Sequence, residues 1–455
     1  MNTETVNAVM QAGVVGAGGA GFPTHVKISA EVDTVIVNGA ECEPLLRVDQ
    51  QLMVTEAEKV IRGLEAIMET TGAATGIIAL KSKYKEACDT LEQLITGKPV
   101  GLFRLDDFFP AGDEQVMVYE VTGKVVPEGG LPLMAGCVVT NVETMLNVAN
   151  ALAGIPVTDT YVTITGAVRN PVTVKLPLGT PVIEALALAG VTETGGVRVI
   201  DGGPMMGRVL TDLTAPVTKV SKGLIVLPEE HPLVLNKTLT MEYIIRRSKS
   251  TCIQCRMCSD LCPRNLLGHR ISPHLIMRGL NYMNGAGDIM KTALLCCECG
   301  VCELYACPML LSPKQVNSEI KKELAGNGIK FSSSGQQQPV VPVERKYRKI
   351  PSKRLIARLG LSRYDVGAGL SEESYCPDRV YIPLKQHIGA PAVPTVKEGQ
   401  QVAKGDLIAA IPENVLGANI HASVKGTVRK VGEHIEIQTG EHLDIETDGE
   451  RGGQC

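Results

Sequence analysis

Nine of the 14 cysteines fall within residues 252–307, and this clustering constrains the fold more than any other feature of the sequence. The segment contains two runs, CIQCRMCSDLCP beginning at Cys252 and CCECGVCELYACP beginning at Cys296. Each run has three cysteines at C-x2-C-x2-C spacing, followed by a fourth cysteine and a proline. This spacing is typical of chains that bind two 4Fe–4S clusters, in which the fourth cysteine of each run ligates the other cluster. We therefore expect a two-cluster domain.

The crossed pattern assigns four thiolates to each cluster. One cluster is predicted to use Cys252, Cys255, Cys258 and Cys307, and the other Cys296, Cys299, Cys302 and Cys262. The second run departs from the usual pattern, because four residues rather than three precede its last cysteine. Cys297 is out of register and is expected not to be a ligand. The alternative is a pair of structural zinc sites, but zinc ribbons use two C-x2-C pairs rather than triplets closed by Cys-Pro.

Composition and charge exclude several classes of protein. A chain of 455 residues is long enough for three or four domains. The formal charge of −4 and the 3% of aromatic residues argue against a nucleic-acid surface, which needs basic and stacking side chains. We find no apolar run near the ~18 residues of a membrane span and no signal peptide. We therefore expect a cytoplasmic protein with reduced thiols, so that clustered cysteines indicate metal ligation.

The amino-terminal segment predicts an α/β domain with a glycine-rich loop. Residues 13–27 read GVVGAGGAGFPTHVK, in which Gly16, Gly18 and Gly21 satisfy G-x-G-x-x-G. Backbone N–H groups without side chains can line a phosphate, although such loops also serve only as tight turns. A strand is predicted at 34–38, with Glu41 and Glu43 at the carboxyl end where α/β sheets bind ligands; solvated loop carboxylates are the alternative. Helices near 24–28, 55–70 and 84–95 and a strand at 76–80 follow.

Three strings carry a resemblance to known flavoproteins. GAGGAGFPTHVK, VNGAECEP and, at 140–148, TNVETMLNV resemble the flavin site of the NADH-oxidising subunit of respiratory complex I. They are closer still to the C subunit of the Rnf complex. The resemblance implies that FMN is held by Gly16, Gly18, Gly19 and Gly21, with Lys27, Asn38 and Asn141 nearby. It also implies that NADH lies against Phe22, Glu41 and Glu43. Ala40 stands where complex I has an aspartate, which weakens the nucleotide assignment relative to the flavin loop.

Two β-rich segments resemble small modules. Residues from Tyr161 read YVTITGAVRNPVTVKLPLGTPVIEALALAG and resemble the SLBB β-grasp domain. From Tyr381, TVKEGQQVAKGDLI and ANIHASVKGTV resemble a barrel-sandwich hybrid of the biotinyl and lipoyl type. The stretch IPENVLGAN lacks the hairpin lysine of a carrier, so this domain is expected to be unmodified. The basic stretch VERKYRKIPSKRLIARLG is interpreted as part of a solvated tether.

The expected architecture is therefore multidomain α/β. The predicted domains are a flavin- and NADH-binding α/β domain at 1–155, an SLBB β-grasp domain at 156–232, a helical ferredoxin-like domain with two 4Fe–4S clusters at 233–330, a basic and polar linker at 331–374, and a barrel-sandwich hybrid at 375–455. A flavin accepts a hydride from NADH and releases electrons singly, whereas a cluster accepts one electron at a time. These parts together predict an NADH-dependent oxidoreductase.

The domain order and the string CCECGVCELYACP resemble the cobalamin reductases of propanediol-utilisation bacterial microcompartments. This resemblance implies reduction of cob(III)alamin toward cob(I)alamin for adenosylcobalamin regeneration, with a corrinoid adenosyltransferase and shell proteins as partners. Localisation in a bacterial microcompartment follows from the same resemblance. No D-x-H-x-x-G corrin signature is present. Two alternatives stay open: an Rnf-like NADH dehydrogenase module that feeds another low-potential acceptor, and a non-catalytic electron-relay or docking subunit, which Ala40 would suit.

Overall fold

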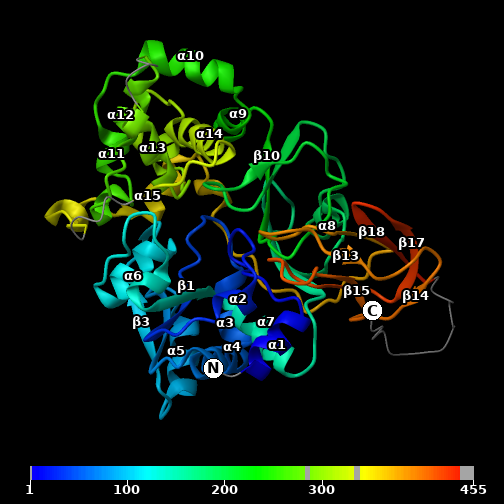
Figure 1. Cartoon of the computed structure of the whole chain (residues 1–455). Helices are drawn as coiled ribbons and strands as arrows, with labels where there is room; N and C mark the ends of the chain where they lie inside the picture. The colour runs from blue at the N-terminus through cyan, green and yellow to red at the C-terminus, as the bar shows by residue number, and fades with distance from the viewer. Residues whose placement is uncertain (1–2, 282–286, 333–338, 441–455) are drawn as a thin grey trace.

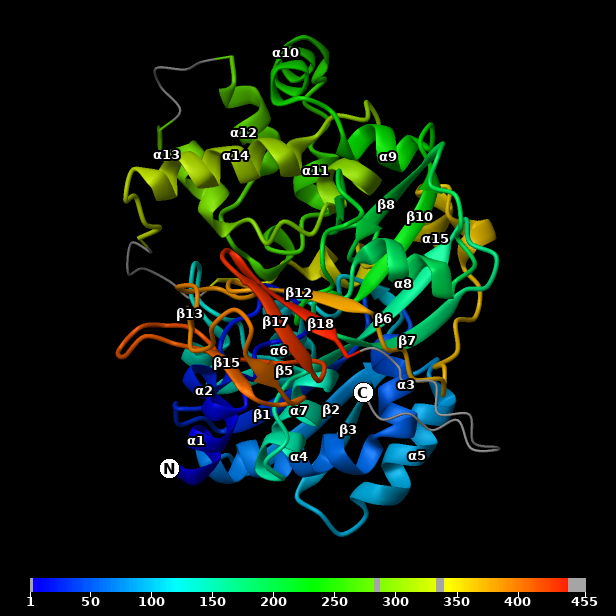
Figure 2. The ribbon, with the colours of Figure 1, turned by 90° about the vertical axis from the view of Figure 1, so that its right-hand side faces the viewer.

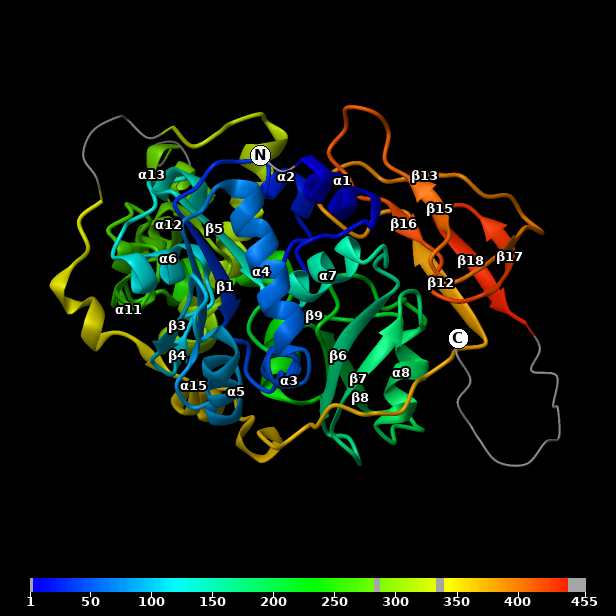
Figure 3. The same ribbon diagram turned by 90° about the horizontal axis from the view of Figure 1, so that it is seen from below.

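The computed structural model describes residues 3–281, 287–332 and 339–440. Figure 1 shows the amino-terminal α/β domain in blue and cyan, a helical domain in green and yellow, and orange and red strands at the carboxyl end. The helical domain and the carboxyl-terminal strands lie on opposite sides of the molecule, as Figures 1 and 3 agree. Among the described residues, every helix is too short or too polar to cross a lipid bilayer.

The amino-terminal domain is built on a parallel sheet with strand order β3-β2-β1-β5. Its strands are β1 (Thr34–Gly39), β2 (Thr75–Lys81), β3 (Val100–Leu105) and β5 (Cys137–Asn141). One face packs on α1 (Thr3–Gln11), α3 (Val48–Thr55), α4 (Ala57–Thr71), α5 (Lys85–Ile95) and α7 (Val142–Leu152). The other face packs on α6 (Glu114–Thr122). Because both faces are covered, the central strands are apolar throughout rather than alternating.

The expected strands at 34–38 and 76–80 and the helix at 84–95 are present. The short helix expected near 24–28 is α2 (Thr24–Lys27). The helix expected at 55–70 is wrong in its start: α4 begins at Ala57, and Glu56 separates it from α3 with a non-helical backbone (φ −123°, ψ 23°). The break lets α3 turn toward the carboxyl end of β1, where Asp49 is buried.

The β-grasp domain follows as a mixed sheet with order β7-β6-β10-β8-β9. Its elements are β6 (Asp159–Gly166), β7 (Val172–Pro177), α8 (Val182–Leu188), β8 (Val197–Asp201), β9 (Arg208–Val209) and β10 (Gly223–Pro228). The hairpin of β6 and β7 is antiparallel, whereas β10 pairs with β6 in parallel and lies in the middle of the sheet. Apolar residues of the sheet and α8 form one core.

Short helices form the domain that carries the cysteine runs (Figure 2). They are α9 (Pro232–Lys237), α10 (Met241–Thr251), α11 (Met257–Asp260), α12 (Pro273–Gly279), α13 (Gly287–Lys291) and α14 (Pro313–Gly326), with a π-helical turn at Val301–Ala306. Apolar side chains from α10, α12 and α14 form the core of this domain together with Cys262 and Cys307. The fourth cysteine of each run is therefore buried.

The basic segment after this domain is not a solvated tether, and that expectation is wrong for residues 343–364. β11 (Ile350–Pro351) pairs with β4 (Phe108–Phe109), and α15 (Ser352–Arg358) buries Leu355 in a core shared with the β-grasp and helical domains. The cations have partners: Arg345 lies 2.6 Å and Lys349 3.0 Å from the Glu120 carboxylate. The segment is a strap that ties domains together, and its charges are satisfied by residues distant in the sequence.

The carboxyl-terminal domain packs two small sheets face to face. One has order β12-β18-β17-β14 and the other β13-β15-β16. The strands are β12 (Arg379–Pro383), β13 (Val393–Pro394), β14 (Gln401–Val402), β15 (Leu407–Ala410), β16 (Ile420–His421), β17 (Gly426–Val431) and β18 (His434–Thr439). Their inward side chains form a separate core. Figure 3 shows these strands beside α1, where the domain reaches the glycine-rich loop.

Candidate redox site

The first cysteine set surrounds a cavity at the outer end of the helical domain, which we call the outer cavity. Its lining includes Cys252, Cys255, Cys258 and Cys307, together with His274 and Met309. The Cys307 Sγ accepts a bond from the Leu311 N–H at 3.4 Å, and the Cys252 Sγ accepts one from Gln254 Nε2 at 3.1 Å. The first run thus meets the last cysteine of the second run, as the crossed pattern requires.

The second set surrounds a more buried cavity, which we call the inner cavity. Its lining includes Cys262, Cys296, Cys297, Cys299 and Cys302. The Cys296 Sγ accepts a bond from the Glu298 N–H at 3.4 Å. The structure therefore brings together each of the two predicted ligand sets. It also places Cys297, expected to be a spectator, on the wall of this cavity.

The two runs share a backbone geometry that explains the C-x2-C spacing. Gln254 and Glu298, which precede the second cysteine of each triplet, have φ of 56° and 58°. Arg256 and Gly300, which follow it, have φ of 67° and 76°. Alternation of left-handed with ordinary conformations turns successive N–H groups inward, toward an anionic group in the concavity. The repeated geometry therefore suits a negatively charged iron–thiolate cube.

The chemistry of the donor set fits such a cluster. Burial, and next the thiols of Cys307 and Cys252, raise the pKa of Cys258 to about 12. Burial and the adjacent Cys297 raise the pKa of Cys296 to about 11. These thiols become thiolates only when a strong positive charge lies among them, which iron supplies. In the described part of the chain, no three His, Cys, Asp or Glu side chains converge closely enough to hold a single metal ion.

The glycine-rich loop lies at the carboxyl end of the parallel sheet, against the start of α7. The Ala17 N–H donates to Thr144 Oγ1 at 3.0 Å. A Cβ on Gly18 would stand 2.9 Å from the Cβ of Asn141, whereas one on Gly19 would meet nothing within 4 Å. Gly18 and Gly19 are exposed, so the turn presents open backbone beside Asn141. This bare turn fits the approach of a phosphate group of FMN.

Asn38 and Lys27 meet a second helix start at the same edge of the sheet. Asn38 Nδ2 donates to the Gly112 carbonyl at 2.8 Å, and Lys27 Nζ lies 2.6 Å from Glu114 Oε1. Asp113 caps α6, because its carboxylate accepts from the N–H groups of two residues in the first turn. Sequence reasoning missed Asp113 and Glu114, although Gly-Asp-Glu before a helix was a local signal for an N-cap at a site.

A second feature that sequence reasoning missed connects this edge to the inner cavity. Arg264 makes a two-pronged pair with Asp113, with Nη1–Oδ1 at 2.6 Å and Nη2–Oδ2 at 3.0 Å. Both side chains are nearly buried. Arg264 follows the Cys262-Pro263 step, so the pair joins a predicted cluster ligand to the helix start that faces Lys27. A cavity of about 360 Å³ lies here, and its lining includes Asp113, Glu114, Arg264 and Cys297.

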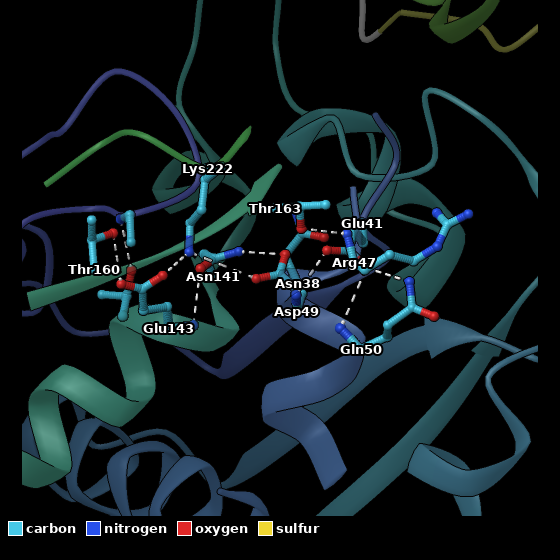
Figure 4. Close-up of polar contacts among 12 residues, drawn as sticks. Asn38, Glu41, Arg47, Asp49, Gln50, Asn141, Glu143, Thr160, Thr163 and Lys222 are labelled. Carbon is cyan, nitrogen blue, oxygen red and sulfur yellow. Dashed lines mark hydrogen bonds and ion pairs between the residues drawn. The ribbon is translucent and has the colours of Figure 1, made fainter. Parts of the chain in front are cut away.

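A buried polar network lies behind Asn141 (Figure 4). Asn141 Oδ1 caps α7 by accepting from the Glu143 N–H, and its Nδ2 donates to Asp49 Oδ2 at 2.8 Å. Lys222 pairs with Glu143 and lies 4.0 Å from Asp49 Oδ1. Burial raises the pKa of Asp49 to about 7, against the attraction of Lys222. The orientation of Asn141 is therefore fixed by two partners, and an ionisable carboxyl lies directly behind it.

The residues predicted for the nucleotide pocket are placed differently. Glu41 and Glu43 both line a cavity of about 350 Å³, along with Arg47 and Lys81. The Glu43 carboxylate accepts from the N–H groups of Met205 and Met206 at 2.8 Å each, and Glu41 accepts from the Asp49 N–H at 2.8 Å. Burial raises the pKa of both. These carboxylates thus hold backbone amides.

Phe22 lies elsewhere. Its side chain is 37% exposed and follows Gly21, whose carbonyl accepts from the Ile388 N–H of the carboxyl-terminal domain. The structure therefore brings Glu41 and Glu43 together at one cavity but keeps Phe22 beside the glycine-rich loop.

Comparisons with known proteins agree with this domain order. Family models match residues 9–150 (Nuo51 FMN-binding domain), 161–209 (SLBB domain), 251–312 (4Fe-4S dicluster domain) and 371–450 (RnfC barrel sandwich hybrid domain). The chain thus has an FMN-binding domain, a two-cluster domain and two β modules, as the sequence predicts. A solved NAD+-reducing [NiFe]-hydrogenase is similar over 74% of this chain and 69% of its own, with 19% identity and a TM-score of 0.47.

Two curated relatives are informative. The RnfC-type component of the Na(+)-translocating ferredoxin:NAD(+) oxidoreductase complex of Acetobacterium woodii is 36% identical over 267 residues, which is 57% of each chain. Cobalamin reductase PduS of Citrobacter freundii is 46% identical over 431 residues, which cover 93% of this chain and 94% of the relative. Similarity at this level across nearly the whole length shows that the chain belongs to the PduS cobalamin reductase family.

Proposed function

We propose that the chain takes a hydride from NADH at FMN and delivers single electrons through two 4Fe–4S clusters to cob(III)alamin, reducing it toward cob(I)alamin. The observation that carries this proposal is the contact between the two halves of the site. Glu114 pairs with Lys27 at the flavin edge, and its neighbour Asp113 pairs with Arg264 beside the inner cavity. Flavin and cluster sites on one chain would thus lie next to each other.

Within this proposal, each residue has a role that its surroundings support. Gly16, Gly18, Gly19 and Gly21 would hold the FMN phosphate, with Lys27, Asn38 and Asn141 orienting the group. FMN supplies the conversion of one two-electron step into two one-electron steps. The nucleotide contacts of Phe22, Glu41 and Glu43 are retained as a proposal, with the two carboxylates acting from the cavity they line.

The direction of electron flow follows from burial. Cys262, Cys299 and Cys302 at the inner cavity are buried, whereas Cys255 at the outer cavity is exposed. Electron transfer rates fall steeply with distance, so electrons enter at the buried set nearest the flavin edge and leave at the exposed set. The ligand sets are Cys262, Cys296, Cys299 and Cys302 for the inner cluster, and Cys252, Cys255, Cys258 and Cys307 for the outer cluster.

Partners and location follow from the family. We propose that a corrinoid adenosyltransferase receives the reduced corrin, and that shell proteins enclose the enzyme in a cytoplasmic bacterial microcompartment. We also retain the domain limits 1–155, 156–232, 233–330, 331–374 and 375–455 as a proposal, with the linker acting as a strap rather than a tether.

An anaerobic assay of NADH oxidation tests the function. We expect hydroxocobalamin to be reduced by the reconstituted chain with NADH, and faster than a clostridial-type ferredoxin supplied at the same concentration. Preference for ferredoxin would favour the Rnf-like alternative. Failure of NADH to bleach bound flavin would instead favour the non-catalytic relay.

A further inference from the structure

The surface over the outer cavity exposes apolar side chains around a cluster ligand. Ile253, Met257 and Leu310 are 61%, 43% and 53% exposed, and Cys255 between the first two is also exposed. Elsewhere in this domain the apolar side chains of α10, α12 and α14 are packed in its core. Exposed apolar groups gathered at one functional point indicate an interaction site rather than scattered surface residues.

The backbone holds these side chains outward. Gln254, Arg256 and Leu310 have φ of 56°, 67° and 52°. Left-handed residues reverse the chain on both sides of Cys255, so the neighbouring Ile253 and Met257 point away from the cavity that the thiol faces. The exposure is therefore a consequence of the ligand geometry and is not a frayed loop.

A cationic rim surrounds the apolar centre. Lys249 in the last turn of α10, Arg256 and Arg278 at the end of α12 are exposed. Arg256 and Arg278 both lower the pKa of His274, after burial, and His274 lines the outer cavity. We call Ile253, Cys255, Met257 and Leu310 with Lys249, Arg256 and Arg278 the outer-cluster face.

The acidic groups nearby do not cancel this charge. Asp260 lies between two cations, 3.9 Å from Arg256 and 3.6 Å from Arg348. Glu242, at the far end of α10 from Cys252, is exposed. The face is thus locally positive on a chain whose formal charge is −4.

We propose that the outer-cluster face is the docking site of an acidic electron-acceptor protein, a proposal that depends on the electron path described above. One electron passes from the reduced outer cluster to the redox group of the acceptor, so the cluster is oxidised and the acceptor reduced by one electron, and no bond is made or broken. Charge decides between occupants. Free aquacob(III)alamin is a cation, so the rim repels it, whereas a protein with a carboxylate-rich surface is steered toward it. The corrin is therefore reduced while held by an acidic protein.

The test uses flavodoxin as an acidic probe and cytochrome c as a basic one, with the full chain reconstituted with iron and sulfide. Dithionite in slight deficit reduces the clusters, so that a failure of the NADH or flavin site does not affect the result. The variant is Lys249→Glu/Arg278→Glu, two exposed positions that are not cluster ligands. Its control is Lys425→Glu, an exposed lysine in the carboxyl-terminal domain. Iron content is measured in each protein.

We expect the rate of flavodoxin reduction to fall with added salt and to drop about tenfold in the double variant at low salt, since close charge pairs govern steered association. Binding of oxidised flavodoxin, measured by fluorescence titration, should weaken in parallel. The salt dependence for cytochrome c should have the opposite sign, and the Lys425→Glu control should match the wild type.

Equal flavodoxin binding and rates in the double variant and the wild type would overturn the proposal. So would a double variant that slows free hydroxocobalamin as much as flavodoxin, because the face would then serve the corrin directly.

Discussion

The Arg264–Asp113 pair should determine both the local stability of α6 and the coupling of the flavin edge to the inner cluster. Arg264→Leu leaves the Asp113 carboxylate nearly buried without its cation, and breaking a buried pair in this way costs about 3–5 kcal/mol. Asp113→Asn removes the charge but keeps an oxygen that can cap α6. Asp113→Ala also removes the cap, which costs about 1 kcal/mol more.

Native-state hydrogen exchange of the α6 amides measures this local free energy, because it reports opening of one element within a multidomain chain. We expect protection to fall in the order wild type, Asp113→Asn, Asp113→Ala. The rate of cluster reduction by NADH should fall in Arg264→Leu, whereas dithionite should still reduce both clusters. As a matched control, Arg104→Leu breaks an exposed pair with Glu92 and should change little. Unchanged α6 protection together with an unchanged NADH rate in Arg264→Leu would refute the reasoning.

Three further predictions concern separate parts of the chain. Cys258→Ala should reduce the iron content from about eight to about four per chain by loss of the outer cluster; eight iron atoms in this variant would contradict the ligand assignment. Gly18→Val should abolish flavin binding and leave the iron content unchanged, because its Cβ would stand 2.9 Å from the Cβ of Asn141; retention of FMN after gel filtration would show that the loop is only a turn. Burial, and next Lys219, lower the pKa of both His387 and His421 from 6.5 to about 4. Below pH 6.5 the unfolded chain binds protons on these rings and the folded chain does not, so stability should fall as pH decreases toward 4. Thermal unfolding should show this loss, and a His387→Gln/His421→Gln variant should show less of it.

Local signals in the sequence predicted the parts of the site that local geometry controls. The cysteine triplets fix the left-handed turns at Gln254 and Glu298, because only that backbone brings thiols at C-x2-C spacing to one cavity. The glycine loop was likewise visible, since Gly18 and Gly19 mark open backbone. The strand at 34–38 followed from its continuous apolar run between polar turns.

Contacts between distant residues could not be predicted in this way. Asp113 and Arg264 are separated by 151 residues, and nothing local in either segment identifies the other. The basic strap was misinterpreted for the same reason. Its charges resemble a solvated tether until Glu120 is found 2.6 Å from Arg345. Glu43 was assigned to a nucleotide, whereas its oxygens accept bonds from the N–H groups of Met205 and Met206.

The central claim is that one chain passes electrons from NADH through FMN and two clusters to cobalamin. Anaerobic stopped-flow spectroscopy tests it most directly, with the reconstituted chain mixed with NADH and hydroxocobalamin. We expect flavin absorbance to fall first, cluster absorbance next, and the corrin spectrum to change last. In Cys258→Ala the flavin should still bleach while reduction of the corrin slows. Corrin reduction at the wild-type rate in that variant, or corrin reduction that precedes cluster bleaching, would contradict the account.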